Sequence, residues 1–376
     1  MELLSAFSLT LMVNHACNLR CNYCYTGSKF NRRMLPGMGD KAIRRALAST
    51  KMGGRLDLGF FGGEPLIEAG RIREWIQYAN IIAFKWDVEI RPHLTTNATI
   101  LTAEAQALLF DPGVELAVSC DGAAATHDHH RRQPDGTGSA AVVHQTIAEL
   151  VARGREFEVI IVVRPDTVSD LPANLDSLRA MGVRRFNISL DLWTEWNQRD
   201  AARLETAVEA AGRFWRAELP NVAINLFDTK LARLVGAPAT EEVTLCGFGH
   251  GEVAVAPSGR LYPCERLIAD DTEDNPTRLP GDIHHGVDFL NLSPADERNA
   301  KACNSCAIRN ACSTTCRCSN YVRTGDVSRP DGLLCLLDKC SFQEAFKLIS
   351  QPHDNTEHTH HERIQKEPIR SHPQLP

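Results

Sequence analysis

Residues 7–24 join an apolar run, Phe7 to Val13, to three cysteines in the spacing Cys17-x3-Cys21-x2-Cys24. The alternation of apolar residues in the run predicts a first buried strand, and the cysteines follow its end. A 4Fe-4S cluster is normally held by four thiolates. A short loop that offers three therefore leaves one iron free for a ligand that is not protein. Zinc binding and buried thiols are the alternatives.

The composition of the whole chain narrows the class of protein. It has 376 residues, a formal net charge of -6 and 13 cysteines. The length suits one large domain and a smaller one, and the mixed charges give no basic footprint for nucleic acid. No stretch reaches the roughly 18 apolar residues of a membrane helix, and the first apolar run lacks the flanks of an export signal. We expect a cytoplasmic protein whose thiols bind metal, with neither nucleic acid nor membrane as partner.

From residue 6 to about 190, short apolar or β-branched runs alternate with helical patterns, as in a parallel α/β sheet. The predicted strands are Phe7–Val13, Leu56–Phe61, Val88–Leu94, Val114–Ser119, Glu158–Val163 and Phe186–Leu190. The predicted helices are Asp40–Lys51, Arg71–Ala83, Ala103–Phe110, Ala140–Arg153 and Leu171–Met181, with one more at Asp200–Ala217. Six such units make a partial (β/α)6 barrel of the TIM type, open at the side, with its site at the carboxyl ends of the strands.

The composition changes after the barrel. Nine cysteines fall between Cys246 and Cys340, in a stretch with little periodicity, so metal sites are expected to hold it together. The tail beyond Gln351 is polar and is predicted to be disordered. We therefore divide the chain into a barrel at 1–230, a small loop-rich iron-sulfur domain at 231–345 and a tail at 346–376.

The three-cysteine loop, with Tyr23 before its last sulfur, resembles the signature of the radical S-adenosylmethionine (SAM) superfamily. This resemblance implies a 4Fe-4S cluster whose open iron binds SAM and whose electron splits it into a 5'-deoxyadenosyl radical. Gly62-Gly63-Glu64-Pro65, directly after a predicted strand, resembles the GGEP element that receives the SAM amino group. A plain turn at the strand end is the alternative.

Polar residues end the next two predicted strands and are expected to face the same cavity. By the resemblance, Ser119 binds the ribose hydroxyls of SAM, with Asp121 as a possible helper. Asn97 is a further candidate, although Asn also caps turns. Cys120 should point the other way, into the core, because successive strand residues face opposite sides.

Two more residues take roles from the resemblance. Arg131 falls where related peptide-modifying enzymes place an arginine for the SAM carboxylate, which a guanidinium fork suits. The alternatives are that Arg132 binds the carboxylate instead, or that Arg131 is a surface residue without a ligand. Asp228 resembles the base of the anaerobic sulfatase-maturating enzymes, which accepts a proton when a substrate carbon is oxidised. A helix cap is the alternative for Asp228.

The carboxyl-terminal cysteines resemble the SPASM pattern of radical SAM enzymes that modify peptides and proteins. They are spaced Cys246-x12-Gly259-x4-Cys264, then Cys303-x2-Cys306-x5-Cys312-x3-Cys316, then Cys335. The resemblance implies two auxiliary 4Fe-4S clusters, the first on Cys246, Cys264 and Cys316 and the second on Cys303, Cys306, Cys312 and Cys335. The fourth iron of the first cluster is bound by Cys318, Cys340 or His250, or it has no protein ligand. A pair of zinc sites is the alternative.

Together these resemblances imply a radical SAM oxidoreductase of the SPASM type. Its substrate is a peptide or protein, and its electrons come from an external donor such as flavodoxin or ferredoxin. Two features favour the conversion of a sulfatase Cys or Ser to formylglycine. One is Asp228, and the other is that the chain begins at the barrel, with no leader-binding domain expected ahead of it. Crosslinking or maturation of a ribosomal peptide is the second candidate. A non-catalytic iron-sulfur electron carrier is the alternative from another class.

Overall fold

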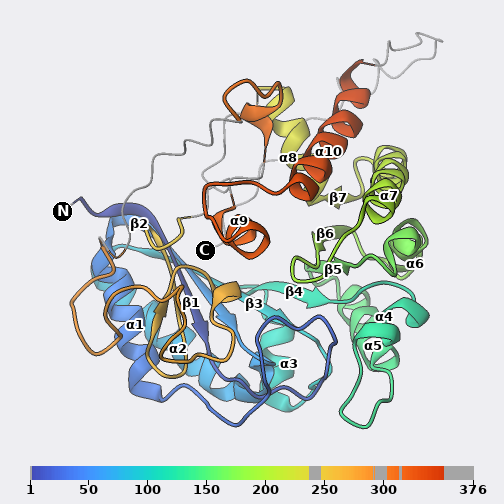
Figure 1. Cartoon of the computed structure of the whole chain (residues 1–376). Helices are drawn as coiled ribbons and strands as arrows, with labels where there is room; N and C mark the ends of the chain where they lie inside the picture. Colours follow the sequence, from blue (N-terminus) through green and yellow to red (C-terminus); the bar gives the residue numbers. More distant parts are fainter. Residues whose placement is uncertain (1, 237–246, 291, 293–302, 313–315, 351–376) are drawn as a thin grey trace, which may run out of the picture.

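The computed structural model describes residues 2–236, 247–290, 292, 303–312 and 316–350 (Figure 1). Its strands are β1 (Leu4–Met12), β2 (Thr50–Phe61), β3 (Glu89–Thr96), β4 (Glu115–Ser119), β5 (Glu158–Val163), β6 (Arg185–Leu190), β7 (Ala223–Ile224), β8 (Glu252–Val255) and β9 (Leu261–Tyr262). Its α-helices are α1 (Pro36–Ser49), α2 (Ala69–Ala83), α3 (Ala103–Leu109), α4 (Ala124–His130), α5 (Ala140–Ala152), α6 (Leu171–Ala180), α7 (Gln198–Glu218), α8 (Asn225–Leu234), α9 (Arg317–Thr324) and α10 (Gly332–Ser350). Within this described part of the chain, no helix combines the length and the apolar character that a membrane crossing needs.

The strands form one sheet in the order β7-β6-β5-β4-β3-β2-β1-β8-β9. Strands β1 to β7 pair in parallel with their neighbours, and β8 pairs in parallel with β1. Because β7 and β9 are the two edges, the barrel does not close within the described residues. Figure 1 shows helices wrapped around the outside of the curved sheet. The predicted partial barrel is confirmed, and β7 adds a seventh parallel strand to the predicted six.

The two faces of the strands serve different purposes. Along β5 the residues are alternately buried and half-buried, because successive side chains point to opposite faces. Val159 and Ile161 face the helices and are buried in the main core, together with Trp75 of α2. Ile160 and Val162 face inward and line the cavity described below. The core therefore lies outside the barrel sheet, which leaves its inner face free for a site.

The carboxyl-terminal part has more regular structure than the sequence suggested. The expectation of little periodicity is wrong for α10, a helix of 19 residues that packs against α7 and α8 (Figure 1). Leu333 and Ala345 of this helix join the main core. The predicted boundary after residue 230 falls inside α8, and β8 and β9 extend the barrel sheet. The division into domains stays a prediction, and the tail beyond residue 350 lies outside the described residues.

One buried ion pair joins α8 to α10. Lys230 Nζ lies 2.6 Å from Asp338 Oδ1, and the two side chains are 2% and 8% exposed. Two buried charges are tolerated as a pair, but removal of one leaves the other uncompensated. The pair therefore holds α10, which carries Cys335, against the end of the barrel.

We predict that Lys230→Met lowers the free energy of unfolding by about 3 kcal/mol, because Asp338 is left buried without a counter-charge. The free energy of unfolding should fall less in the double variant Lys230→Met/Asp338→Leu, because no buried charge is left unpaired. Arg213→Met, which breaks an exposed ion pair with Glu209 on α7, should cost less than about 1 kcal/mol. Anaerobic urea unfolding measures the stability of all three variants. Equal losses of stability in Lys230→Met and Arg213→Met would contradict the role given to the buried ion pair.

Candidate active site

The three amino-terminal cysteines lie in the loop after β1, at the carboxyl edge of the sheet. Cys17, Cys21 and Cys24 are half-buried, form no disulfide and line one cavity of about 240 Å³. Burial raises the pKa of Cys17 to about 12 and that of Cys21 to about 11. Burial opposes ionisation of Cys24 too, but Lys29 Nζ, 3.0 Å from its Sγ, brings the pKa of Cys24 below its ordinary value. Three thiols gathered in one cavity suit a metal centre, which ionises them on binding.

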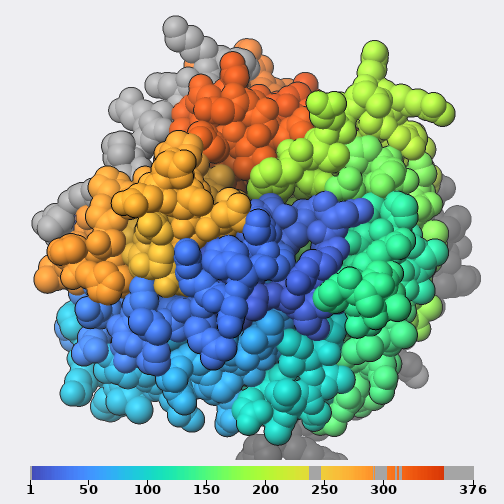
Figure 2. Space-filling view, turned by 60° about the horizontal axis from the view of Figure 1, so that its bottom comes forward, coloured from blue at the N-terminus to red at the C-terminus, as the bar shows by residue number. Residues whose placement is uncertain are grey.

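Main-chain hydrogen bonds fasten this loop on two sides. The N–H of Gly63 donates to the carbonyl of Asn14 over 3.0 Å, and the N–H of Arg20 donates to the carbonyl of Arg132 over 2.7 Å. The loop is thus held between the end of β2 and the segment after α4. Figure 2 shows the blue amino-terminal segment between the orange residues that follow β9 and the green part of the barrel.

The glycine pair after β2 approaches the loop too closely for any side chain. A Cβ on Gly63 would lie 2.2 Å from the carbonyl oxygen of Ala16, and one on Gly62 would lie 2.7 Å from that of Asn14. These neighbours are main-chain atoms, which cannot turn aside as a flexible side chain could. The predicted glycine element therefore lies directly beside the residues that lead into Cys17.

Glu64 links the ends of β2 and β3. Its Oε1 accepts hydrogen bonds from the N–H of Leu66 (3.0 Å) and the hydroxyl of Thr96 (2.6 Å), and its Oε2 accepts one from the N–H of Asn97 (2.8 Å). Burial raises the pKa of Glu64 to about 7, although these three bonds oppose the rise. Asn97 Nδ2 lies 3.9 Å from Cys17 Sγ. Glu64 thus anchors the glycine element and places Asn97 beside the first cysteine.

Arg131 and Asp121, predicted to contact SAM separately, pair with each other. Arg131 Nε and Nη2 lie 3.0 and 3.2 Å from the two carboxylate oxygens of Asp121, which also accept from the Tyr23 hydroxyl (2.6 Å) and the Val162 N–H (3.1 Å). Burial opposes the charge of Arg131, but Asp121 raises its pKa well above the ordinary value. Arg131 lines the cavity, whereas Asp121 lies behind it. Its carboxylate therefore positions Arg131 and Tyr23.

Ser119 ends β4 and lines the cavity, as its position in the sequence suggested, and Cys120 is fully buried in the core. Polar lining residues that sequence reasoning missed are Lys29, Asn187, Ser189, Asp191, Glu265 and Arg266. Asp191 follows β6, and its carboxylate pairs with Arg164. Glu265 and Arg266 directly follow Cys264, and this adjacency to a predicted metal ligand is the signal that could have found them.

Three stacked aromatic rings form one wall of the cavity. Tyr25 lies between Phe61 and Trp193, with ring centroids 5.9 and 4.7 Å apart and interplanar angles of 8° and 7°. All three residues line the cavity, and Trp193 is 45% exposed. The wall thus runs from the cysteine loop to the molecular surface.

Asp228 lies in the first turn of α8 and does not line this cavity. Its carboxylate accepts hydrogen bonds from the indole N–H of Trp215 (3.0 Å) and from the main-chain N–H of Ile224. Burial raises the pKa of Asp228. These contacts are those of a carboxylate that holds the start of a helix, which was the alternative to its predicted role as a base.

A second group of sulfurs lies behind the cavity wall. Cys316 Sγ is 3.3 Å from Cys318 Sγ, and Cys264 belongs to the same buried cluster. Cys264 and Cys318 pack in this cluster together with Leu267. Burial opposes the charge of the nearby Arg266, but the sulfurs raise its pKa. Cys246, the other predicted ligand of this group, lies outside the described residues.

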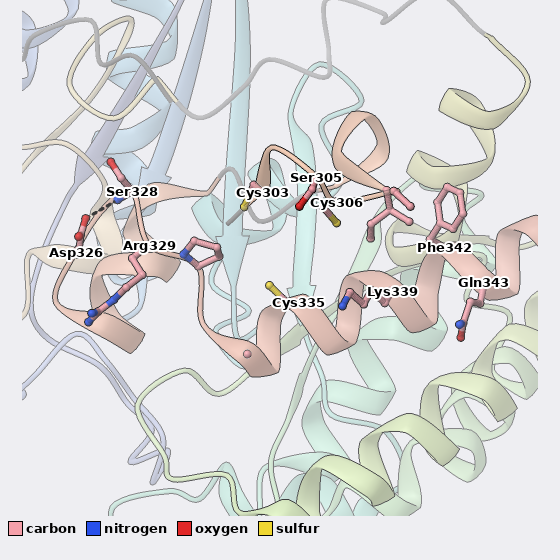
Figure 3. Close-up of a pocket in the computed structure, with 14 residues that line it drawn as sticks. Cys303, Ser305, Cys306, Asp326, Ser328, Arg329, Cys335, Lys339, Phe342 and Gln343 are labelled. Atoms are coloured by element: carbon pink, nitrogen blue, oxygen red, sulfur yellow. Dashed lines mark hydrogen bonds between the residues drawn. The ribbon is translucent and has the colours of Figure 1, made fainter. Parts of the chain in front are cut away.

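A third group lines an open cavity of about 880 Å³ at the start of α10. Figure 3 shows Cys303 and Cys306 on a loop, with the sulfur of Cys335 on the facing helix and Lys339 one turn further. Cys312 lies next to this loop, after the short helix Arg309–Ala311, but does not line the cavity. Burial and the neighbouring Cys303 raise the pKa of Cys335. The arrangement suits a metal centre between loop and helix.

Comparisons with known proteins agree with this geometry. The sequence profile of the Radical SAM superfamily matches residues 11–172. The cysteine-type anaerobic sulfatase-maturating enzyme of Clostridium novyi (strain NT) is 22% identical over 285 residues, 70% of this chain and 75% of that protein. The mycofactocin maturase MftC of Mycobacterium ulcerans (strain Agy99) is 23% identical over 346 residues, 86% of each chain.

The fold also matches a solved structure. Native anSMEcpe with bound AdoMet and Kp18Cys peptide has a TM-score of 0.72 at 20% identity, and the match covers 91% of this chain and 97% of that one. The sheet, the position of the cysteine loop and the superfamily profile point to one conclusion. The chain carries a radical SAM domain over residues 11–172 and is a radical SAM enzyme, with anaerobic sulfatase-maturating enzymes and a mycofactocin maturase among its homologues.

Proposed function

We propose that this enzyme cleaves SAM reductively and oxidises a side chain of a peptide or protein, with the conversion of a sulfatase Cys or Ser to formylglycine as the first candidate. The observation that carries the proposal is that one cavity joins the three amino-terminal cysteines to the glycine pair, to Ser119 and to the residues directly after Cys264. A cluster, SAM and a substrate side chain would therefore meet in one place.

The residues present fit a cluster with bound SAM. Cys17, Cys21 and Cys24 would hold three irons of a 4Fe-4S cluster, which when bound supplies the electron that opens the sulfonium bond of SAM. The main chain of Gly62 and Gly63 comes close enough to the loop to receive the amino group of SAM. The hydroxyl of Ser119 is the candidate donor to the ribose.

Arg131 lines the cavity and remains the candidate for the carboxylate of SAM. Asp121 engages its Nε and one N–H of Nη2, which leaves the outer edge of the guanidinium, with Nη1 and the second N–H of Nη2, for the carboxylate of SAM. We propose that Arg131 also contributes its positive charge to the cavity wall beside Cys21, where burial raises the pKa of the thiol and the charge of Arg131 opposes that rise. Asn97 and Lys29, also on the wall, are further candidates for contact with SAM.

Oxidation of a substrate carbon needs a proton acceptor after the hydrogen atom and one electron have left. Asp228 was predicted for this role, but its two carboxylate oxygens are held by Trp215 and Ile224. Glu265 lines the cavity, and its Oε2 lies 3.4 Å from Cys264 Sγ. A base must reach the proton that it removes. These contacts favour Glu265 over Asp228.

A peptide substrate suits the open side of the barrel. Trp193 is exposed at the cavity wall and stacks on Tyr25, which offers an apolar surface near the proposed site of radical formation. Support also comes from the sulfatase-maturating relatives and from the peptide bound in the solved neighbour. Maturation of a ribosomal peptide is the second candidate, because the match to mycofactocin maturase covers 86% of both chains.

The carboxyl-terminal cysteines are proposed to hold two auxiliary 4Fe-4S clusters that carry the substrate's electron away. Cys264 and Cys316 would serve the first, with Cys246, and the loop of Figure 3 together with Cys312 and Cys335 would serve the second. A small external donor such as flavodoxin or ferredoxin would supply the electron for SAM cleavage.

We predict that reduced, anaerobically reconstituted protein releases 5'-deoxyadenosine from SAM, and that a peptide with a sulfatase Cys or Ser motif gains an aldehyde. Mass spectrometry measures both products. Absence of 5'-deoxyadenosine would leave the electron-carrier alternative. Release of 5'-deoxyadenosine without an aldehyde would redirect the search to ribosomal peptides. Glu265→Gln should lower aldehyde formation by about 100-fold while SAM cleavage continues; the same loss in Asp228→Asn instead would restore Asp228 as the base.

We also predict that Gly63→Ala lowers 5'-deoxyadenosine formation by about 100-fold, because the new Cβ displaces the glycine element from the cysteine loop and misplaces bound SAM. Gly37→Ala is the matched control, since a Cβ there meets no atom within 4 Å. Iron content, measured in parallel, should stay close to that of the unsubstituted protein. Unchanged turnover in Gly63→Ala would mean that this glycine does not set the position of SAM.

A further inference from the structure

Cys318 is a buried thiol to which the cysteine spacing assigns no role. Its side chain is 2% exposed, and it lies at the second position of α9, directly after Cys316 and Arg317. Helical side chains lean toward the amino end of their helix. The thiol of Cys318 is therefore turned back toward Cys316, which lies just before the helix in extended conformation.

The contacts of Cys318 are with predicted cluster ligands. Its Sγ is 3.3 Å from Cys316 Sγ, and Cys264 belongs to the same buried cluster as Cys318. Leu267 packs against these sulfurs, with Phe248 at the edge of the same cluster. Two of the cysteines that the sequence pattern assigns to the first auxiliary cluster therefore lie in one sulfur group with Cys318.

The surroundings suit a buried group of thiolates. Arg266 places a positive charge beside the three sulfurs, and its Nη1 lies 3.4 Å from Ser319 Oγ. The hydroxyl of Ser319 donates to Cys316 Sγ over 3.2 Å. Hydrogen bonds and positive charge stabilise ionised sulfur in a buried site.

The two other candidates for the fourth ligand, Cys340 and His250, do not belong to the buried cluster of Cys264 and Cys318. Cys340 lies in α10 as part of the main core, where its charged neighbours are Glu205, Glu344 and Glu209. His250 is exposed in a turn closed by its own N–H to the carbonyl of Gly247.

Two carboxylates also lie within reach of Cys264, because one oxygen each of Glu252 and Glu265 falls within 4.8 Å of its sulfur. Glu252 Oε2 accepts the N–H of Gly247 over 3.0 Å, so this carboxylate holds the turn. Glu265 lines the SAM cavity and is the proposed base. Iron-sulfur clusters are held by cysteine thiolates far more often than by carboxylates.

We infer that Cys318 is the additional ligand of the first auxiliary cluster. The inference rests on the proposed function, which supplies that cluster. With the three cysteines that the sequence pattern already assigns, Cys318 brings the number of thiolate ligands to four. The cluster then has no open iron for substrate, and it acts as an electron carrier directly behind the wall formed by Glu265 and Arg266.

The test uses a parent chain with Cys17→Ala, Cys21→Ala and Cys24→Ala, which lacks the one cluster expected to keep an open iron. Cys318→Ala is compared with Cys340→Ala, a buried cysteine away from the three sulfurs. Each reduced protein is mixed with ¹³C-cyanide and examined by electron–nuclear double resonance, with iron and zinc counted in the same samples. We expect no ¹³C coupling in the parent or in Cys340→Ala. In Cys318→Ala we expect either a new coupling or a loss of about half of the roughly eight irons.

Several results would overturn the inference. They are ¹³C coupling already present in the parent chain, full iron with no coupling in Cys318→Ala, an equal loss of iron in Cys340→Ala, and zinc in place of iron. The ¹³C measurement on the parent chain tests the inference even if the Cys318→Ala variant does not fold. Release of 5'-deoxyadenosine by the unsubstituted protein is measured separately, so a failure of the proposed function is distinguishable from a failure of this ligand assignment.

Discussion

The structure depends on a loop that must present three sulfurs to one cavity and still leave room for a fourth, non-protein ligand. Side chains of a short loop do not hold such a geometry unaided. Main-chain bonds from Gly63 and Arg20 tie the loop to neighbouring segments on two sides. The glycine pair fits against the loop because no Cβ intervenes. The position of the sulfurs is thus a property of the barrel edge.

The parallel sheet accounts for the rest of the site. The carboxyl ends of parallel strands meet at one edge, so the cysteine loop after β1, the glycines after β2 and Ser119 of β4 face the same cavity. Glu64 strengthens this edge by joining the end of β2 to the end of β3 through two hydrogen bonds, from Thr96 and Asn97. Pairing of β8 with β1 then brings Glu265 and Arg266, which follow β9, to the cavity wall, with Cys264 behind them. Two sulfur groups far apart in sequence become neighbours through one strand pairing.

The sequence predicted those features that depend on short-range spacing. The cysteine loop, the glycine pair and the strand pattern could be read directly, and the strand β5 was placed without error. Features that depend on which side chains pair across the fold could not be predicted from the sequence. Arg131 and Asp121 each suited a SAM contact alone, and no spacing rule indicated that they pair with each other. Asp228 was assigned by position, but the Trp215 indole that engages it comes from another helix. Glu265 reaches the cavity only through long-range strand pairing.

The central claim is that the loop of Cys17, Cys21 and Cys24 holds a 4Fe-4S cluster whose open iron binds SAM. Electron–nuclear double resonance of the reduced protein with SAM labelled with ¹⁵N at the amino group and ¹⁷O at the carboxylate tests it most directly. The account predicts couplings of both labels to the reduced cluster, and their loss in Cys21→Ser. A spectrum without coupling from either label, or zinc in place of iron at these three cysteines, would contradict it.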